Sequence, residues 1–243
     1  CQTAVNLWFS NQAEANATYG HISDWNVSAV TDMSNAFQDR ATFNEDISGW
    51  DMSKVNNASR MFYGASSFNQ PIGNWNLSSA TIIWGLFEEA SSFNQPIGDW
   101  NVSAVTSIAN MFKGASSFNQ PIGVWDISNI ITLTNLFNGA AAFNQPIGDW
   151  NVSSVTKMSY MFSNATALSS MNKGLIHKAF SSNPNWTTDW RKFVVINDSN
   201  FQDVVNLWFS NQADANASYG HIRDWNVSQV TDMSNAFQDR ATF

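Results

Sequence analysis

The sequence repeats itself every 25 residues, and this period constrains the possible fold more than any other feature. The hexapeptide FNQPIG begins at Phe68, Phe93, Phe118 and Phe143, and a weaker copy, FNEDIS, begins at Phe43. A period of this length is typical of proteins in which each repeat buries the apolar face of its neighbour. We therefore expect the repeats to stack side by side as equivalent turns.

Aromatic residues follow the same period in three columns. One holds Trp, a second holds the Phe that lies twelve residues after each Trp, and a third holds the Phe that begins FNQPIG. The columns are Trp25, Trp50, Trp75, Trp100, Trp125 and Trp150; Phe37, Phe62, Phe87, Phe112, Phe137 and Phe162; and Phe68, Phe93, Phe118 and Phe143. Because large rings carry much of the burial energy, we interpret these columns as a structural core ladder and not as a platform for ligands.

Two periodicities within one repeat predict a strand followed by a helix. Residues 72–77 alternate between apolar and polar, as a short strand does. Ser78 stands at a helix N-cap position, and in the next repeat Val105, Ile108 and Met111 share the spacing of one helix face. Strand-helix units of this length can only pack in parallel. The expected fold class is therefore α/β, a right-handed solenoid of 25-residue strand-helix turns with helical caps.

A second period of 200 residues lies on top of the first. Residues 5–43 return at residues 205–243 with only four substitutions. The last copy stops at Phe243, the counterpart of Phe43, in the middle of a 25-residue turn. An open half-turn would leave its apolar face uncovered, so we expect the chain to be a section of a longer tandem array.

These periods divide the chain into four segments. Residues 1–24 are expected to form a capping helix at the N-terminal end, and residues 25–168 a solenoid of about six 25-residue repeats. The repeat pattern fails after Leu168, so we interpret residues 169–204 as the closing cap and linker. Residues 205–243 are expected to be the truncated start of the next 200-residue unit.

Composition limits the classes of partner. The net charge is −8, the pI is near 4.6 and only 12% of the residues are charged, whereas a protein that binds a nucleic-acid backbone is normally basic. No run of about eighteen apolar residues occurs, so we expect no membrane span. Cys1 is the single cysteine, which excludes an internal disulfide framework and a Cys-rich zinc site.

The run WNVSxVTxMxxMFxGAxxFNQPIGxW resembles the repeat of the BspA-like leucine-rich-repeat surface proteins, an element also found in many mycoplasma lipoproteins. The likeness covers residues 19–168 and resumes at Tyr219, although Gly85, Glu88 and Glu89 depart from the usual pattern of their turn. The resemblance implies a secreted or surface-tethered, leucine-rich-repeat-like solenoid. It also implies a role in adhesion or surface architecture, without enzyme activity.

The family also contains lipoproteins, whose mature chains begin with a lipid-modified cysteine. Cys1 would match such a residue, but the equivalent position in the second copy holds Phe201. We favour the interpretation that Cys1 is only the point at which this section begins.

Eleven Asn-X-Ser/Thr sequons make N-glycosylation a candidate modification. Six lie outside the repeat register: Asn16, Asn57, Asn164, Asn185, Asn197 and Asn216. Five lie in the register, directly after the Trp: Asn26, Asn76, Asn101, Asn151 and Asn226. Asp51 and Asp126 replace Asn in this column, and an Asp cannot carry a glycan. We therefore interpret the column as a structural turn in which a short side chain accepts a hydrogen bond from the backbone two residues on.

The sequence contains no recognisable catalytic motif, and we expect no enzyme and no cofactor. The three His residues are scattered, and His21 and His221 occupy equivalent positions that suggest packing or capping roles. Stacked carboxylates such as Asp99 and Asp149 could hold Ca²⁺. No recurrent Asp-x-Asp or EF-hand loop occurs, however, so we expect a solvated surface and no metal.

Two functions fit these observations. In the first, the chain is a section of an extracellular structural protein whose 200-residue units join head to tail into a fibre or surface appendage, with copies of itself as partners. In the second, it is a cell-surface adhesin or binding module that recognises a protein or carbohydrate through the solenoid face. An Asn-rich, Lys-poor composition favours an extracellular or cell-surface location for both.

Overall fold

The computed structural model describes residues 1–241 and 243, and it divides into two compact bodies. The first body comprises residues 1–145 and 149–168, and the second comprises residues 146–148 and 169–243. The first body begins with α1 (Gln2–Ser10), α2 (Gln12–Tyr19) and the 3-10 helix η1 (Ile22–Asp24). The second body holds α3 (Ser170–Phe180), η2 (Arg191–Phe193), α4 (Phe201–Ser210), α5 (Gln212–Tyr219) and η3 (Ile222–Asp224).

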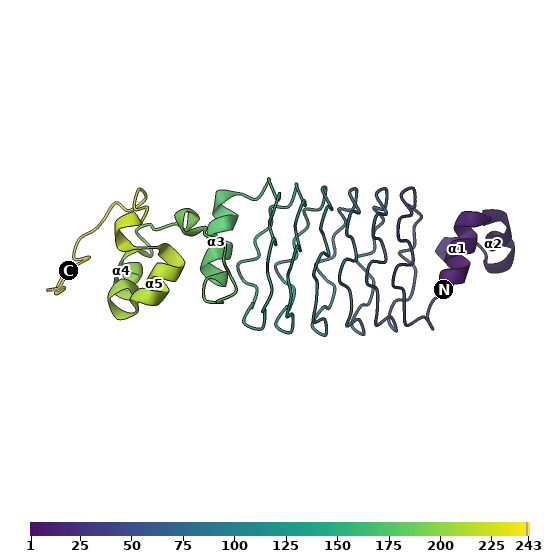
Figure 1. Cartoon of the computed structure of the whole chain (residues 1–243), viewed down its shortest axis with the longest axis horizontal. Helices are drawn as coiled ribbons and strands as arrows, with labels where there is room; N and C mark the ends of the chain where they lie inside the picture. The colour runs from purple at the N-terminus through teal and green to yellow at the C-terminus, as the bar shows by residue number, and fades with distance from the viewer. Residues whose placement is uncertain (242) are drawn as a thin grey trace. The chain divides into compact units, whose positions relative to one another are not determined.

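The prediction of an α/β fold made of strand-helix turns is wrong. Residues 25–168, all of which the structure describes, contain no α-helix and no strand. In Figure 1 they form a row of stacked turns drawn as plain tube. Adjacent turns touch through isolated parallel bridges, among them Asp32 with Asn57 and Asn57 with Ile82.

The segment predicted as a helix is a series of tight turns with an alternating hydrogen-bond pattern. The N–H of Met111 donates to the carbonyl of Ile108 within the same turn, at 3.1 Å. The N–H of Phe112 instead donates to the carbonyl of Leu136 in the next turn, at 3.0 Å. An α-helix would direct every N–H to the residue four positions back. The apolar spacing of three or four residues therefore arises from successive turns and not from a helix face.

Left-handed backbone conformations also prevent a helix in this segment. Asn110 has φ 58°, a value that L-residues adopt rarely and that interrupts a right-handed helix. The same position is left-handed in each turn, at Asn35, Arg60, Gly85, Asn110, Asn135 and Tyr160. One of these residues is Gly and three are Asn, the types that adopt this conformation most readily, whereas Arg60 and Tyr160 give no sign of it in the sequence.

The aromatic columns lie in the interior of the stack. Successive Phe rings from Phe37 to Phe162 are 5.5–5.9 Å apart, and within a turn Phe87 and Phe93 stack at 3.8 Å. The six Trp side chains and the Phe side chains from Phe37 to Phe143 are buried, whereas Phe162 is half-buried. Because successive Phe rings stack from one turn to the next, they form continuous apolar columns.

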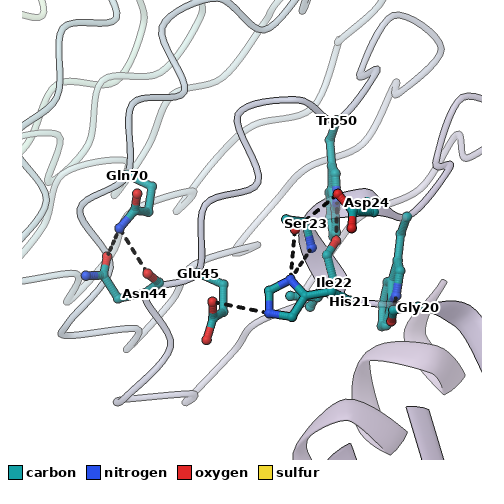
Figure 2. Close-up of polar contacts among 10 residues, drawn as sticks. Gly20, His21, Ile22, Ser23, Asp24, Asn44, Glu45, Trp50 and Gln70 are labelled. Carbon is teal, nitrogen blue, oxygen red and sulfur yellow. Dashed lines mark hydrogen bonds and ion pairs between the residues drawn. The ribbon is translucent and has the colours of Figure 1, made fainter. Parts of the chain in front are cut away.

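Five of the six Trp residues also bond to the preceding segment 28 residues back through the indole N–H, whereas Trp25 donates to Gly20 just before it. The Nε1–H of Trp50 donates to the carbonyl of Ile22 at 2.9 Å (Figure 2), and that of Trp100 donates to Ile72 at 3.1 Å. The bond recurs in Trp75, Trp125 and Trp150. A buried indole needs such an acceptor, which explains why no other aromatic residue replaces Trp in this column.

The second body repeats the N-terminal part of the first. Trp208 meets Trp225 edge to face at 5.8 Å, as Trp8 meets Trp25 at 6.0 Å. In both copies the capping region consists of two short helices and not one, because an Asn between them ends the first helix and caps the second. The apolar core of this body consists of Ile196, Phe201, Val204, Val205, Trp208, Ala215, Trp225 and Ala236.

We expect Phe112→Ala to lower the free energy of unfolding by about 3–5 kcal/mol, because it removes a fully buried ring that stacks within its own column and on Phe118 of the next, and leaves a cavity. Denaturant unfolding monitored by circular dichroism would measure the loss. Val124→Ala is the matched control, since Val124 is 81% exposed in the adjacent turn and should change stability by less than about 0.5 kcal/mol. Equal effects of the two substitutions would contradict the interior role of the column.

Candidate functional site

The sequons in the repeat register form structural turns. The N–H of Ser28 donates to Oδ1 of Asn26 at 3.1 Å, and the N–H of Ser128 donates to Oδ1 of Asp126 at 3.0 Å. Asn76, Asn101, Asn151, Asn226 and Asp51 accept the same bond. This is the hydrogen bond that the sequence predicts for a short side chain at this position. The hydroxyl and backbone N–H of Ser128 also hold the pKa of Asp126 below its usual value.

Some sequons outside the register have structural roles that the sequence did not indicate. Asn57 lies in the bridge column, where its Oδ1 accepts hydrogen bonds from the N–H and hydroxyl of Ser59. Asn197 accepts the same pair of bonds from Ser199, and the amide of Asn185 bonds to Asn183. These three Asn residues therefore have structural roles, as the Asn residues in the register do. Asn16 and Asn164 are exposed, and Asn216 is half-exposed.

A ladder of side-chain amides runs along the FNQP column. The N–H of Asn119 donates to Oδ1 of Asn94 at 2.9 Å, and Nε2 of Gln120 donates to the same oxygen at 3.0 Å. The first step of the ladder joins Gln70 to Asn44 (Figure 2), and further steps start from Asn69 and Asn119. The recurrence of FNQP every 25 residues indicates that these Asn and Gln residues lie next to their counterparts in adjacent turns. It does not reveal that the Asn backbone N–H and the Gln side-chain amide donate to the same Asn oxygen.

Charged groups meet in one cluster that spans three turns. The carboxylate of Glu88 is 3.0 Å from Nζ of Lys113 and 3.9 Å from Nε of Arg60. The guanidinium of Arg60 lies 4.1 Å from the centre of the Tyr63 ring and 5.7 Å from that of Trp84. The hydrogen bond to Glu88 raises the pKa of Lys113. Glu88 departs from the repeat pattern, and its buried carboxylate has two basic partners, Arg60 and Lys113.

The outward carboxylates do not assemble a metal site. Within the described part of the chain, no three side chains of His, Cys, Asp or Glu gather where they could hold a metal ion. The Asp residues in the turns instead bond to neighbouring Ser residues, as Asp46 does to the N–H of Ser48 at 2.9 Å. Separately, no helix among residues 1–241 and 243 combines the length and apolar character that crossing a bilayer requires.

The segment of residues 169–200, called the junction segment below, packs on the second copy within the second body. Asp198 accepts hydrogen bonds from the N–H of Thr231, the hydroxyl of Thr231 and the N–H of Asp232. These bonds lower the pKa of Asp198. Asn197 also forms a parallel bridge with Gln229. Backbone and side-chain contacts together therefore fix the junction segment on this copy.

His177 of α3 lies at the centre of this contact and is 4% exposed. Its Nδ1 accepts the indole N–H of Trp186 at 3.0 Å, and its Nε2 contacts the carbonyl of Ala217 at 2.9 Å. Because an indole nitrogen can only donate, the ring proton of neutral His177 must lie on Nε2. Burial lowers the pKa of His177, although the Ala217 carbonyl and the carboxylate of Asp189 oppose this shift.

The periodic hydrogen bonds and stacked rings define a repeat protein. The chain belongs to a family described as "Mycoplasma protein of unknown function, DUF285", whose model matches residues 3–96, 84–178 and 175–243. Three consecutive matches agree with tandem repetition, but they do not single out the BspA-like leucine-rich-repeat proteins. No curated protein and no solved structure matches the chain.

We expect Asn94→Ala to destabilise the protein by about 1–3 kcal/mol, because the N–H of Asn119 and the amide of Gln120 then lose their shared acceptor. Asn94→Asp is the matched control, since it keeps the acceptor oxygen and should retain most of the stability. Chemical denaturation of both variants would measure the difference. The amide ladder would have no stabilising role if Asn94→Ala unfolded at the same denaturant concentration as the parent.

The stability of the second body should fall as the pH decreases below about 6.5, the usual pKa of His. The folded pKa of His177 is lower than the unfolded value, so the unfolded chain binds the proton first and gains stability. The contribution of His177 to the free energy of unfolding is therefore fully present above about pH 6.5, and it is lost as the pH falls toward the pKa of His177 in the folded protein.

His177→Gln tests this prediction, because Gln keeps a donor and an acceptor but does not titrate. Thermal melting of parent and variant at pH 7.5 and pH 5.0, values chosen on either side of about 6.5, would show a smaller decrease for the variant. Carboxylates elsewhere affect both proteins alike. An identical decrease in both would exclude His177 as the source.

Proposed function

We propose that this protein has a structural role without enzyme activity, as a section of an extracellular fibre or surface appendage made of 200-residue units. The observation that carries the proposal is that residues 5–43 and 205–243 are nearly identical in sequence and that each copy forms the same series of two α-helices and a 3-10 helix, α1–α2–η1 in the first and α4–α5–η3 in the second. Identical copies at a fixed spacing allow the same contact to recur along a chain, which is what a regular filament requires.

The agreement between the two copies extends to single hydrogen bonds. Arg40 donates to Oδ1 of Asn6 at 3.2 Å, and Arg240 donates to Asn206 at 3.0 Å. The amide of Gln2 bonds to the carbonyl of Ala36, and that of Gln202 bonds to Ala236. Contacts this similar support the view that each copy begins an equivalent repeat array.

The hydrogen bonds between adjacent repeats also support a structural role. Each turn is joined to the next by backbone hydrogen bonds, an indole N–H and the amide ladder. Contacts between nearest neighbours make such an array extendable, because an added turn requires no new type of interface. The location at the cell exterior rests on the composition and on the resemblance to surface proteins.

Electron microscopy of the natural full-length protein tests this function. We expect uniform rods with a constant axial repeat, one for each 200-residue unit, and mass spectrometry of the same material should give a polypeptide with several such units. Any glycan or lipid would be visible in the same spectrum. Isolated particles without an axial repeat would contradict the structural role.

A cell-surface adhesin is the second candidate, and the aromatic and basic cluster around Arg60 favours it. Trp84 stands where the other turns carry small residues, and it is half-exposed near the Arg60 guanidinium, which also contacts the Tyr63 ring. Aromatic rings with polar neighbours are common in binding surfaces. Binding to a glycan or host-protein array that is lost in Trp84→Ala, while the rods persist, would support this function.

A further inference from the structure

A cavity of about 610 Å³ lies within the second body, where the junction segment packs on the second copy. We call it the junction cavity; residues 189–196 contribute one part of its lining and residues 216–226 the other. Val194, Ile196 and Gly220 are buried where they line it, and Tyr219 is half-buried. Pockets that hold small ligands usually measure about 300–1,000 Å³ and have a largely apolar lining. The size and the buried apolar residues of the junction cavity therefore suit a small ligand.

Charged side chains also line the junction cavity, and most of them form pairs. Two nitrogens of Arg191 donate to the carboxylate of Asp189 at 2.8 and 2.7 Å, which lowers the pKa of Asp189 to about 2. The guanidinium of Arg223 lies 3.5 Å from the carboxylate of Asp224. Lys192 takes part in none of the ion pairs formed by the residues that the structure describes. The lining thus has a surplus positive charge, in a chain whose net charge is −8.

One of the four substitutions between the two copies lies in this cavity and changes its charge. Arg223 replaces Ser23, whereas the other three substitutions keep the charge. With Ser at this position, the carboxylates of the lining would offset its cations. The backbone N–H of Ser23 donates to Nδ1 of His21 at 3.3 Å, and that of Arg223 donates to Nδ1 of His221 at 3.3 Å. The local fold is therefore kept, and this position is free to adjust the charge of a ligand site.

A further turn stacked on the second copy would leave this side of the junction cavity open. The first copy shows this, because the turn that follows it is part of the structure. Asp24 and Asn26, which correspond to two residues of the cavity lining, remain exposed there. The following turn instead brings the carboxylate of Glu45 to 3.8 Å from Nε2 of His21 (Figure 2). We therefore leave His221, the counterpart of His21, out of the proposed site.

We propose that the junction cavity binds a small acidic sugar, a sugar ring that carries one carboxylate. Nζ of Lys192 pairs with the carboxylate, and the exposed guanidinium of Arg223 adds a second cationic group to the lining. Val194 and Ile196 offer apolar surface to the C–H groups of the ring. This inference goes beyond the proposed function, since the site lies in the second body and not in the stack of repeats.

The polar residues of the junction cavity fit the hydroxyl groups of a sugar. Oδ1 of Asn226 accepts the N–H of Ser228 at 3.1 Å, so the amide nitrogen of Asn226 remains as a donor. Asn216 and Tyr219 supply further groups that can donate and accept. A phosphate monoester fits less well, because it carries about two negative charges and would meet the two carboxylates of the lining.

Titration of the full 243-residue chain, followed by NMR, tests this site. The probes are the methyl glycosides of glucuronic acid and of glucose, which differ only in carrying a carboxylate or a hydroxymethyl group. We expect the glucuronide to bind with a dissociation constant about tenfold lower than that of the glucoside, because a charged hydrogen bond is added. The chemical shifts that change should belong to residues 189–196 and 216–226.

Substitutions separate the two cationic groups. Lys192→Gln should abolish the preference for the glucuronide, because Gln keeps a polar side chain but not the charge. Arg223→Ser, which introduces the residue type of the first copy, should weaken glucuronide binding about threefold, since Asp224 already shares this guanidinium. Lys178→Gln is the matched control: Lys178 is exposed on α3 outside the lining, and its loss changes the net charge equally. This variant should keep both dissociation constants.

Equal affinity for the two glycosides would overturn the proposal, and so would an absence of binding or shift changes outside the cavity. A loss of the preference in Lys178→Gln would also overturn it, because net charge and not the cavity would then be responsible. Circular dichroism verifies that each variant remains folded. None of these results bears on the fibre, which microscopy of the natural protein tests separately.

Discussion

The structure depends on a division of the backbone N–H groups between two tasks. In each turn, one N–H closes a tight turn and the next crosses to the following turn, as those of Met111 and Phe112 do. Buried backbone groups need partners, and this alternation supplies them without a helix or a sheet. It also brings the turns close enough for the aromatic rings to stack, so the apolar core follows from the hydrogen-bond pattern.

Side chains form the hydrogen bonds that backbone groups alone do not provide. The indole of Trp100, Oδ1 of Asn94 and Oδ1 of Asp126 each satisfy groups at a point where the chain changes direction. Polar residues thus act as recurrent parts of the repeat, because each supplies a donor or an acceptor at a fixed position. The substitution of Asp for Asn after Trp50 and Trp125 obeys this condition.

The 25-residue period and the choice of Asn or Asp after each Trp were sufficient to predict the repeats and the turn bonds of Asn26 and its equivalents. The secondary structure could not be predicted, because Val105, Ile108 and Met111 have the spacing of a helix face although the N–H groups of Val105 and Met111 close tight turns and that of Phe112 crosses to the next turn. The left-handed conformation of Arg60 and Tyr160 left no mark in the sequence, since these residue types rarely adopt it. The contacts of Asp198 with Thr231 and Asp232 also remained hidden, because they join residues outside the 25-residue register.

The hydrogen bonds that join adjacent turns have a mechanical consequence. A force that pulls residue 25 away from residue 168 would act on the boundaries between adjacent turns, which are held by bonds such as those from Phe112 to Leu136 and from Trp100 to Ile72. Such an array gives way in small, equal steps and can re-form from the part that is still intact. We expect the turns to separate one after another under tension, in contrast to the turns of a domain that unfolds as a whole.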